Sequence, residues 1–221
     1  RRARSRRCRA RARGAGSTPP STPTDPVTPR PGADASAEAF DALVRARRTS
    51  LVMDPERPVE MAVVRELCAL ATWAPNHKLT WPWVFAVVVG DGRARLGEVA
   101  AEAMARHGDP APRVAKTRGK YLRAPVVVAV GTLPGDTELR TAENRDAVAA
   151  GIQNLLLGAT ARGLASFWSS CPKGANDPVA AAVGFAAGTH VTGLVYLGWR
   201  SPGPTPATIE RPPAEIRVVD A

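Results

Sequence analysis

The spacing of apolar residues along the chain predicts five helices. Apolar side chains three and four residues apart form one face of a helix, and proline favours the first turn of a helix but stops it farther along. The predicted helices lie at 37–48, 58–74, 93–106, 142–162 and 178–184. The helix at 142–162 is apolar on nearly every side, which indicates burial, and a second subunit is one surface that could bury it.

Short continuous apolar runs predict buried strands at 84–90 and 124–132, because such runs between turn residues are typical of strands with both faces covered. A short strand is predicted at 165–170 and a further strand at 189–199. A polar, basic loop is expected before Arg123, and a proline-rich, extended segment at 202–213. Helices and strands are intermixed with uneven connections, so the sequence predicts an α+β fold with helices packed on a small sheet.

The first 37 residues follow a different pattern, without apolar periodicity and rich in Arg, Ala, Pro, Ser, Thr and Gly. Such a segment cannot bury enough surface to offset the entropy of ordering. We therefore expect a disordered extension at 1–37 and one domain at 38–221. Residues 1–38 hold nine arginines against three acidic residues, so they contribute +6 of the formal net charge of +10.

Three interpretations of this extension stay open. An Arg-rich start that is nearly free of acidic residues is typical of a transit peptide. A basic arm can also bind nucleic acid. The third interpretation is a non-functional extension or a misplaced start, because the sequence does not begin with Met. A secretory signal is excluded, since no apolar segment follows the arginines.

The cysteines and the hydropathy indicate a protein of a reducing compartment, for which we expect the cytoplasm. Cys8, Cys68 and Cys171 are odd in number and far apart, which does not fit a disulfide framework. No run approaches the ~20 apolar residues that a membrane-spanning helix needs.

The motifs of metal and nucleophile chemistry are missing from the sequence. The three histidines are far apart, and neither HxxxH nor CxxC occurs, so no metal site is expected. Ser169, Ser170 and Cys171 have no histidine at a meaningful spacing, which disfavours a nucleophile. What remains is polar residues near the ends of predicted strands, an arrangement suited to a cofactor that carries the chemistry itself. These groups are 47–50, 76–78, 168–170 and 199–200.

In that order, the polar groups resemble the FMN-dependent nitroreductase family, most closely its short bacterial members. The matching motifs are RRTS (47–50), APNHK…WPW (74–83), APVVV (124–128), AAGIQNLLLGATARGLASFWSS (149–170) and VGFAAGTHVTGLVYLGW (183–199). The resemblance implies a nitroreductase-like α+β fold, with a central, mostly antiparallel sheet flanked by helices. It also implies an intertwined homodimer with FMN at the interface, where the tail at 202–219 embraces the partner and EIRVV (215–219) could add an edge strand.

The resemblance implies that Arg47, Arg48 and Thr49 bind the phosphate of FMN. Two arginines and a hydroxyl supply fork-like donors for a phosphate, and Arg47 and Thr49 are favoured because alternate residues of an extended segment face one side. Arg200 would be a second phosphate contact. Two alternatives stay open: arginines that follow a helix complement its C-terminal dipole, and Arg200 is equally well an exposed arginine.

Other motif residues are implied to surround the flavin ring. Trp168, Ser169 and Ser170 match a strand end that lies along the isoalloxazine. Trp73 and His77 match residues at the FMN that the other subunit mainly binds, although His77 could equally be a loop histidine with local partners.

A further stretch, GATARG (158–163), corresponds to one linked in similar proteins with the nicotinamide cofactor. It implies contacts from Gly158, Arg162 and Gly163, with a helix-capping role for Arg162 as the alternative. The tryptophans of WPW would wall an aromatic slot, although Trp81 stands where the family often has Gln and puts a polar contact there in doubt.

The implied activity is the reduction of nitroaromatics, quinones or similar flat, electron-poor acceptors by NAD(P)H. NAD(P)H would pass hydride to FMN and leave before the acceptor binds, a ping-pong mechanism that needs no catalytic side chain. The alternatives are a specialised flavin chemistry such as enone reduction or flavin destruction, a flavin-storing homologue, and a nucleic-acid-binding protein that uses the basic arm.

Overall fold

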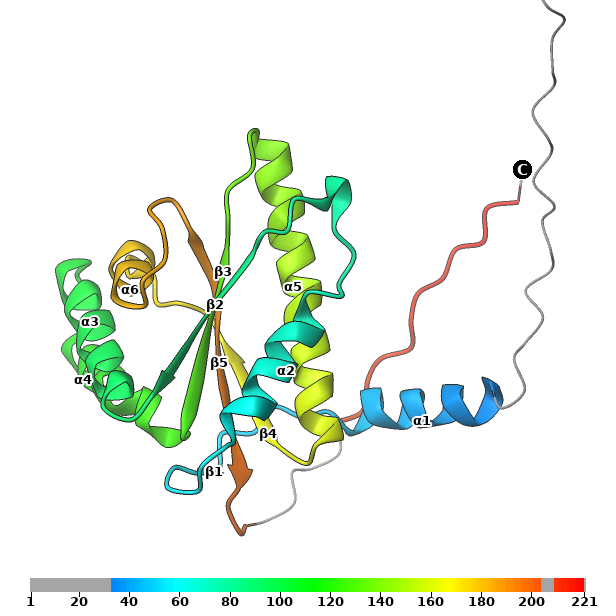
Figure 1. The fold of residues 1–221 in the computed structure, drawn as a ribbon, viewed down its shortest axis with the longest axis horizontal. Coiled ribbons are helices and arrows are strands. Elements are labelled where there is room, and N and C mark those ends of the chain that lie inside the picture. Colours follow the sequence, from blue (N-terminus) through cyan, green and yellow to red (C-terminus); the bar gives the residue numbers. More distant parts are fainter. Residues whose placement is uncertain (1–32, 204–208, 221) are drawn as a thin grey trace, which may run out of the picture.

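Five antiparallel strands form the sheet at the centre of the molecule (Figure 1). The computed structural model describes residues 33–203 and 209–220. β5 lies between β3 on one side and β4 and β1 on the other. β2 pairs with β3 and completes the sheet. The strands are β1 (Met53–Asp54), β2 (Trp83–Val89), β3 (Val126–Thr132), β4 (Ala165–Ser169) and β5 (His190–Arg200). The predicted, mostly antiparallel sheet is therefore confirmed.

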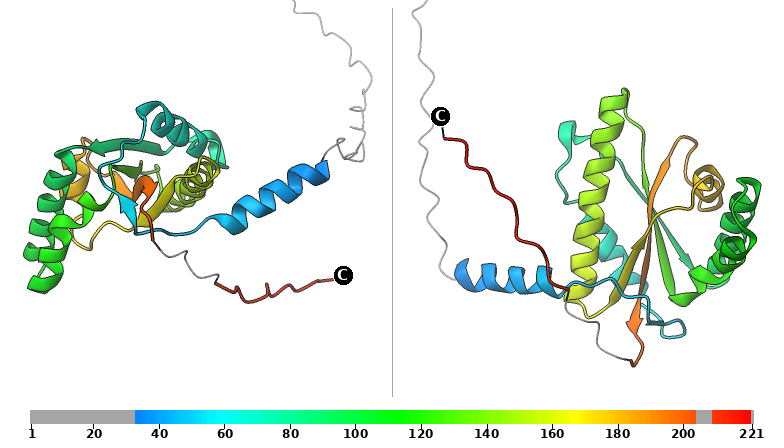
Figure 2. Two further views of the ribbon diagram at one scale, coloured as in Figure 1. Left: turned by 90° about the horizontal axis from the view of Figure 1, so that it is seen from below. Right: turned by 180° about the vertical axis from the view of Figure 1, so that it is seen from behind.

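Helices cover both faces of this sheet (Figure 1). One face carries α2 (Met61–Ala71) and α5 (Glu138–Ala161), and the other carries α3 (Gly92–Arg106) and α6 (Asn176–Ala182), with α4 (Ala111–Gly119) packed on α3. Short 3₁₀ turns occupy His77–Leu79 and Lys120–Arg123. The remaining helix, α1 (Ala33–Ala46), projects from the end of the body near the C-terminal end of α5 (Figure 2).

The alternation of side chains along β3 creates two cores. Val126, Val128 and Val130 face α2 and α5, whereas Val127 and Ala129 face α3 and α6, and all of them are buried. Because both faces are covered, the strand is apolar throughout rather than alternating, which is why its sequence predicts a buried strand.

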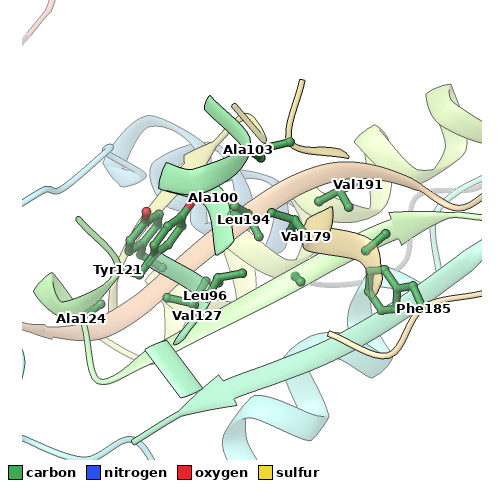
Figure 3. Packing of buried hydrophobic residues seen from close by; sticks show 14 of the residues in the cluster. Leu96, Ala100, Ala103, Tyr121, Ala124, Val127, Val179, Phe185, Val191 and Leu194 are labelled. Atoms are coloured by element: carbon green, nitrogen blue, oxygen red, sulfur yellow. The ribbon is translucent and has the colours of Figure 1, made fainter. Parts of the chain in front are cut away.

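An aromatic pair anchors the second of these cores (Figure 3). Tyr121, just ahead of β3, stacks on Tyr196 of β5 with ring centroids 5.9 Å apart and planes 2° apart. Phe167 of β4 also stacks on Tyr196, with ring centroids 5.3 Å apart and planes 30° apart. Burial raises the pKa of both tyrosines, so both stay neutral at physiological pH.

Two glycines allow neighbouring helices to approach closely. A Cβ on Gly97 of α3 would lie 2.0 Å from the carbonyl oxygen of Arg118 in α4. A Cβ on Gly158 of α5 would lie 2.8 Å and 2.9 Å from the side chains of Leu70 and Leu67 in α2. A side chain at Gly97 would force α3 and α4 apart because it meets backbone, whereas one at Gly158 would require the two leucine side chains to shift.

The main departure from the predicted elements is α4, which the sequence analysis assigned to a basic loop. Only Val114 and Thr117 of this helix are buried, too few to produce a clear apolar period. The contact with α3 stabilises the helix, and that contact is not visible in the local sequence. Strand β1 is two residues long and was also missed.

The predicted boundaries of other elements differ by a few residues. The helix expected at 142–162 begins earlier, at Glu138, because the side chain of Thr137 accepts a hydrogen bond from the amide of Arg140 and caps it. Helix α1 begins at Ala33, ahead of the predicted domain start, while the rest of the predicted extension, 1–32, lies outside the described residues.

Residues 209–220 lie away from the body, without regular secondary structure and with exposed side chains (Figure 1). Within residues 33–203 and 209–220, no helix combines the length and the apolar character that crossing a bilayer requires.

Candidate functional site

The segment that follows α1 runs beside the start of β4. The amide of Ser50 donates to the carbonyl oxygen of Ser166 at 3.0 Å, and Thr49 forms a parallel bridge with Ser166. The guanidinium of Arg48 donates to the carbonyl oxygens of Arg45 and Arg47. Arg48 thus caps α1, the structural alternative left open for it, while Arg47 and Arg48 are both half-buried.

Pairing of β1 with β5 brings Arg200 to this same end of the sheet. Met53 lies opposite Arg200, a few residues after Thr49 in the chain. Arg47, Thr49 and Arg200 therefore lie as a group at one end of the sheet, although Arg200 is about 150 residues away in sequence. The hydroxyl of Ser166 is buried beside them without a hydrogen-bond partner among the described residues, a polar group that no sequence motif revealed.

Trp168–Ser170 continue along β4 from this cluster. A strand rises about 3.3 Å per residue, so Ser169 lies roughly 10 Å beyond Ser166. The Trp168 indole lies over Gly193, where an added Cβ would be 2.1 Å from its Nε1, and this nitrogen donates to the carbonyl oxygen of Thr192 at 3.4 Å. The absence of a side chain at Gly193 thus fixes the tryptophan, which stays 38% exposed.

His77 belongs to a separate polar cluster at the start of α5. Its Nδ1 lies 2.8 Å from Oε1 of Glu143 and 3.1 Å from Nη1 of Arg140, and the same arginine nitrogen lies 2.7 Å from Oε2 of Glu143. These three residues form a compact network of charge-assisted contacts.

The two clusters lie at opposite ends of α5. A helix rises about 1.5 Å per residue, so Glu143 and the helix end at Ala161 are roughly 27 Å apart along the axis. Within one chain, His77 therefore does not meet Arg47 and Thr49. That separation fits the expectation that His77 serves the site of the other subunit, which stays a prediction.

The loop between α2 and β2 is strained. Lys78, Leu79 and Trp81 have positive φ angles of 63°, 51° and 49°, a conformation that costs about 1–3 kcal/mol per non-glycine residue and is frequent at functional sites. Asn76 holds the loop, since its Oδ1 accepts from the amide of Trp81 at 2.8 Å and its Nδ2 donates to Thr80 at 3.0 Å. The sequence analysis did not predict this strain.

The strained loop points its apolar side chains outward. Trp73 is 83% exposed and Trp81 is 59% exposed, while Trp83 is half-buried against Gly151. The rings of Trp81 and Trp83 are tilted, with centroids 6.2 Å apart. Because Trp73 and Trp81 leave most of their surface exposed, the indoles do not enclose the expected aromatic slot within the part of one chain that the structure describes.

The three residues assigned to the nicotinamide cofactor have structural contacts of their own. Gly158 packs against α2, and Gly163, with a φ of 73°, follows the C-terminal end of α5. Arg162 donates to Glu66 at 3.0 Å and to the carbonyl oxygen of Gly158 at 3.2 Å. These contacts explain their conformations without a ligand, and the nicotinamide assignment stays a prediction.

Burial controls the protonation state of the two thiols that the structure describes. It raises the pKa of Cys68 and of Cys171 from 9.0 to about 11, so both stay protonated at neutral pH. The residues that the structure describes contain no group of three or more His, Cys, Asp or Glu that could hold a metal ion.

Sequence comparison finds similarity to nitroreductases. The model of the nitroreductase family matches residues 44–199, which is more than half of the chain. The curated relatives include the Escherichia coli K12 protein named "Putative NAD(P)H nitroreductase YdjA", 24% identical over 73% of this chain and 87% of its own length. Another is "Putative NAD(P)H nitroreductase YfhC" of Bacillus subtilis, 26% identical over 80% of this chain and 92% of its own length.

Solved structures share the fold. A nitroreductase-like family protein from Bacillus cereus aligns with a TM-score of 0.67 and 25% identity, covering 78% of this chain and 91% of its own. The FMN-dependent nitroreductase NfnB from Mycobacterium smegmatis, solved with NADPH, aligns with a TM-score of 0.61 and 23% identity, covering 75% and 89%.

Proposed function

This chain belongs to the nitroreductase family, and from that premise we propose that it is an FMN-dependent oxidoreductase. In this proposal it uses NAD(P)H to reduce nitroaromatic, quinone or similar flat, electron-poor acceptors. The single observation that supports the proposal is that Arg47, Thr49 and Arg200, which are far apart in sequence, lie at one end of the sheet.

The chemistry of this cluster fits the phosphate of FMN. Guanidinium groups and hydroxyls are donors that match phosphate oxygens, and the buried hydroxyl of Ser166 is one donor that lacks a partner among the described residues. We propose that Arg47, Thr49 and Arg200 hold the phosphate. Arg48 contributes charge while its guanidinium caps α1.

Trp168, Ser169 and Ser170 are proposed to flank the flavin ring, because they continue along β4 from the phosphate cluster. Bound FMN would supply the chemistry, accepting hydride from NAD(P)H and passing it to the acceptor in ping-pong order. The protein orients the ring: Trp168 is fixed over Gly193 and offers an exposed apolar surface on which a planar group can stack.

A second copy of the chain is proposed to complete the site. One chain leaves Phe40 of α1 58% exposed and Val219 of the tail 90% exposed, and apolar surface of this kind marks interaction sites. In a homodimer, the strained loop of the partner would bring Trp73 and His77 to the flavin. Residues 215–219 could then pair with a sheet edge, and the cytoplasm is the proposed location.

The double substitution Arg47→Ala with Arg48→Ala tests the phosphate assignment. We expect the purified wild type to be yellow, with about one FMN per chain, and the variant to lose most of its flavin, because hydrogen bonds to a charged group contribute about 1.5–3 kcal/mol each. Flavin per chain is measured by absorbance after release, and folding by circular dichroism.

Arg45→Ala is the matched control, since Arg45 lies on the same helix but pairs with the exposed Asp41 at 2.9 Å. It should keep its flavin. Unchanged flavin content in the double variant would refute the phosphate assignment, and a colourless wild type that does not bind added FMN would refute the proposed function.

A further inference from the structure

A polar cavity lies between α4 and the segment that follows β4. Its volume is ≈ 360 Å³. Three cationic side chains, Arg113, Lys120 and Lys173, contribute to its lining, together with Trp168 and Ser170. The cations come from the basic segment before β3 and from the loop after β4, and the proposed function assigns no role to any of the three.

The positive charge of this cavity is only partly neutralised. Arg113 pairs with Asp109 at 2.9 Å. In contrast, neither Lys120 nor Lys173 forms an ion pair with any residue that the structure describes. Lys173 is exposed, whereas Lys120 is half-buried, with its amine 4.9 Å from the centroid of the Tyr121 ring. A half-buried cation without a counter-charge is unfavourable, and an anion would relieve it.

The local electrostatics agree with this geometry. Burial lowers the pKa of the Lys120 amine, and the nearby charges of Arg123 and Arg113 lower it further, while Cys171 acts in the opposite direction. The protein thus concentrates like charges at one wall of a cavity, a pattern more typical of binding sites than of structural ion pairs.

We propose that this cavity is a subsite for an oxyanion carried by one of the two substrates. This inference rests on the proposed function, because the cavity and the proposed flavin contacts meet at Trp168–Ser170. Lys120 and Lys173 bind the oxyanion, and the hydroxyl of Ser170 supplies a neutral donor. The oxyanion is either a phosphate of the nicotinamide donor or the carboxylate of an aromatic acceptor.

The test compares Lys120→Met, Lys173→Met and the double variant with Lys116→Met. Lys116 is the matched control because it lies on α4, four residues before Lys120, is exposed and does not line the cavity. Methionine keeps the length of the side chain and removes the charge. Flavin per chain is measured in every variant, so a failure of the proposed function is recognised separately.

Inorganic phosphate is the first probe, titrated at constant ionic strength into protein saturated with FMN, so that the proposed phosphate site at Arg47, Thr49 and Arg200 is already filled. Binding is followed by thermal stabilisation. We expect the dissociation constant to rise roughly tenfold or more in the double variant, because two charge-assisted contacts are lost, and to stay at the wild-type value in Lys116→Met. Equal phosphate binding by wild type and double variant would overturn the subsite.

Steady-state kinetics then identify the source of the oxyanion. In the donor arm, the KM of NADPH and that of NADH are measured with a neutral quinone as the acceptor. In the acceptor arm, 4-nitrobenzoate is compared with the uncharged 4-nitrobenzamide as the acceptor. A raised KM for either or both donors in the double variant assigns the subsite to the donor. Lost preference for nitrobenzoate assigns it to the acceptor. Phosphate binding that weakens while both arms stay unchanged would overturn the substrate role.

Discussion

The sheet with its covering helices differs from three peripheral segments in how fully one chain buries the apolar side chains. Within the sheet, Val127 and Val128 are completely inaccessible. In α1, the loop after α2 and the tail, Phe40, Trp73 and Val218 are 58%, 83% and 86% exposed. The first region is complete within one polypeptide, whereas the second has apolar surface without a partner.

This difference locates the candidate site at the boundary between the two regions. Arg47, Thr49 and Arg200 are positioned by hydrogen bonds to β4 and by the pairing of β1 with β5, and so belong to the complete region. His77 and Trp73 belong to the peripheral loop at the far end of α5. We propose that the site combines this rigid half with a second half that another copy of the chain supplies.

The largest effect is expected from substituting apolar residues of the tail, one of the three peripheral segments. Ile216→Asp with Val218→Asp should raise the dimer dissociation constant at least about a hundredfold and release FMN, because burial of each apolar side chain contributes about 1.5–3 kcal/mol. Sedimentation velocity and flavin content are the measurements. Glu215→Gln with Arg217→Gln alters the interleaved residues of the same tail and should change neither quantity. A dimer of unchanged affinity in the aspartate variant would remove the proposed role of the tail.

A substitution within the sheet and its covering helices should have a smaller, local effect on stability. Gly97→Val would place a side chain against the backbone of α4, where even a Cβ lies 2.0 Å from the Arg118 oxygen, and should lower the free energy of unfolding by about 1–3 kcal/mol. Urea denaturation measures it. Gly119→Ala is the control, since a Cβ there has no atom within 4 Å. Equal stability of the two variants would show that the close contact of α3 and α4 is not tightly packed.

The smallest effect is expected at His77. His77→Ala removes the hydrogen bond to Glu143 and the proposed contact with the partner's flavin, so flavin affinity or the acceptor KM should change roughly two- to tenfold, the range of one hydrogen bond. Lys78→Ala, an exposed neighbour, should have no comparable effect. If the two variants behave alike in flavin titration and kinetics, His77 is a loop residue with local contacts only.

The strands and the long helix could be predicted from sequence because their environments are uniform. β3 is covered on both faces and reads as a continuous apolar run, and α5 is packed along most of its length. Helix α4 was not predicted from sequence, because its stability depends on the missing side chain at Gly97, a residue on another helix. A periodic pattern records burial along one element but not the shape of its neighbour.

The candidate site divides in the same way. The order of the motifs in the sequence led to Arg47, Thr49, Trp168 and His77 as candidates for binding FMN. Each was a candidate because the phosphate, the flavin ring and the polar edge of the flavin pocket require particular side chains. No pattern indicated the unpartnered hydroxyl of Ser166 or the left-handed backbone at Lys78–Trp81.

The sequence by itself determined most of the element types, the family and the chemical character of the candidate residues, because hydrophobic period and donor type are local properties. Only the tertiary structure decided that Thr49 and Arg200 share one end of the sheet while His77 lies at the other end of α5. Strand pairing and helix length set those distances, and both depend on contacts between residues far apart in the chain.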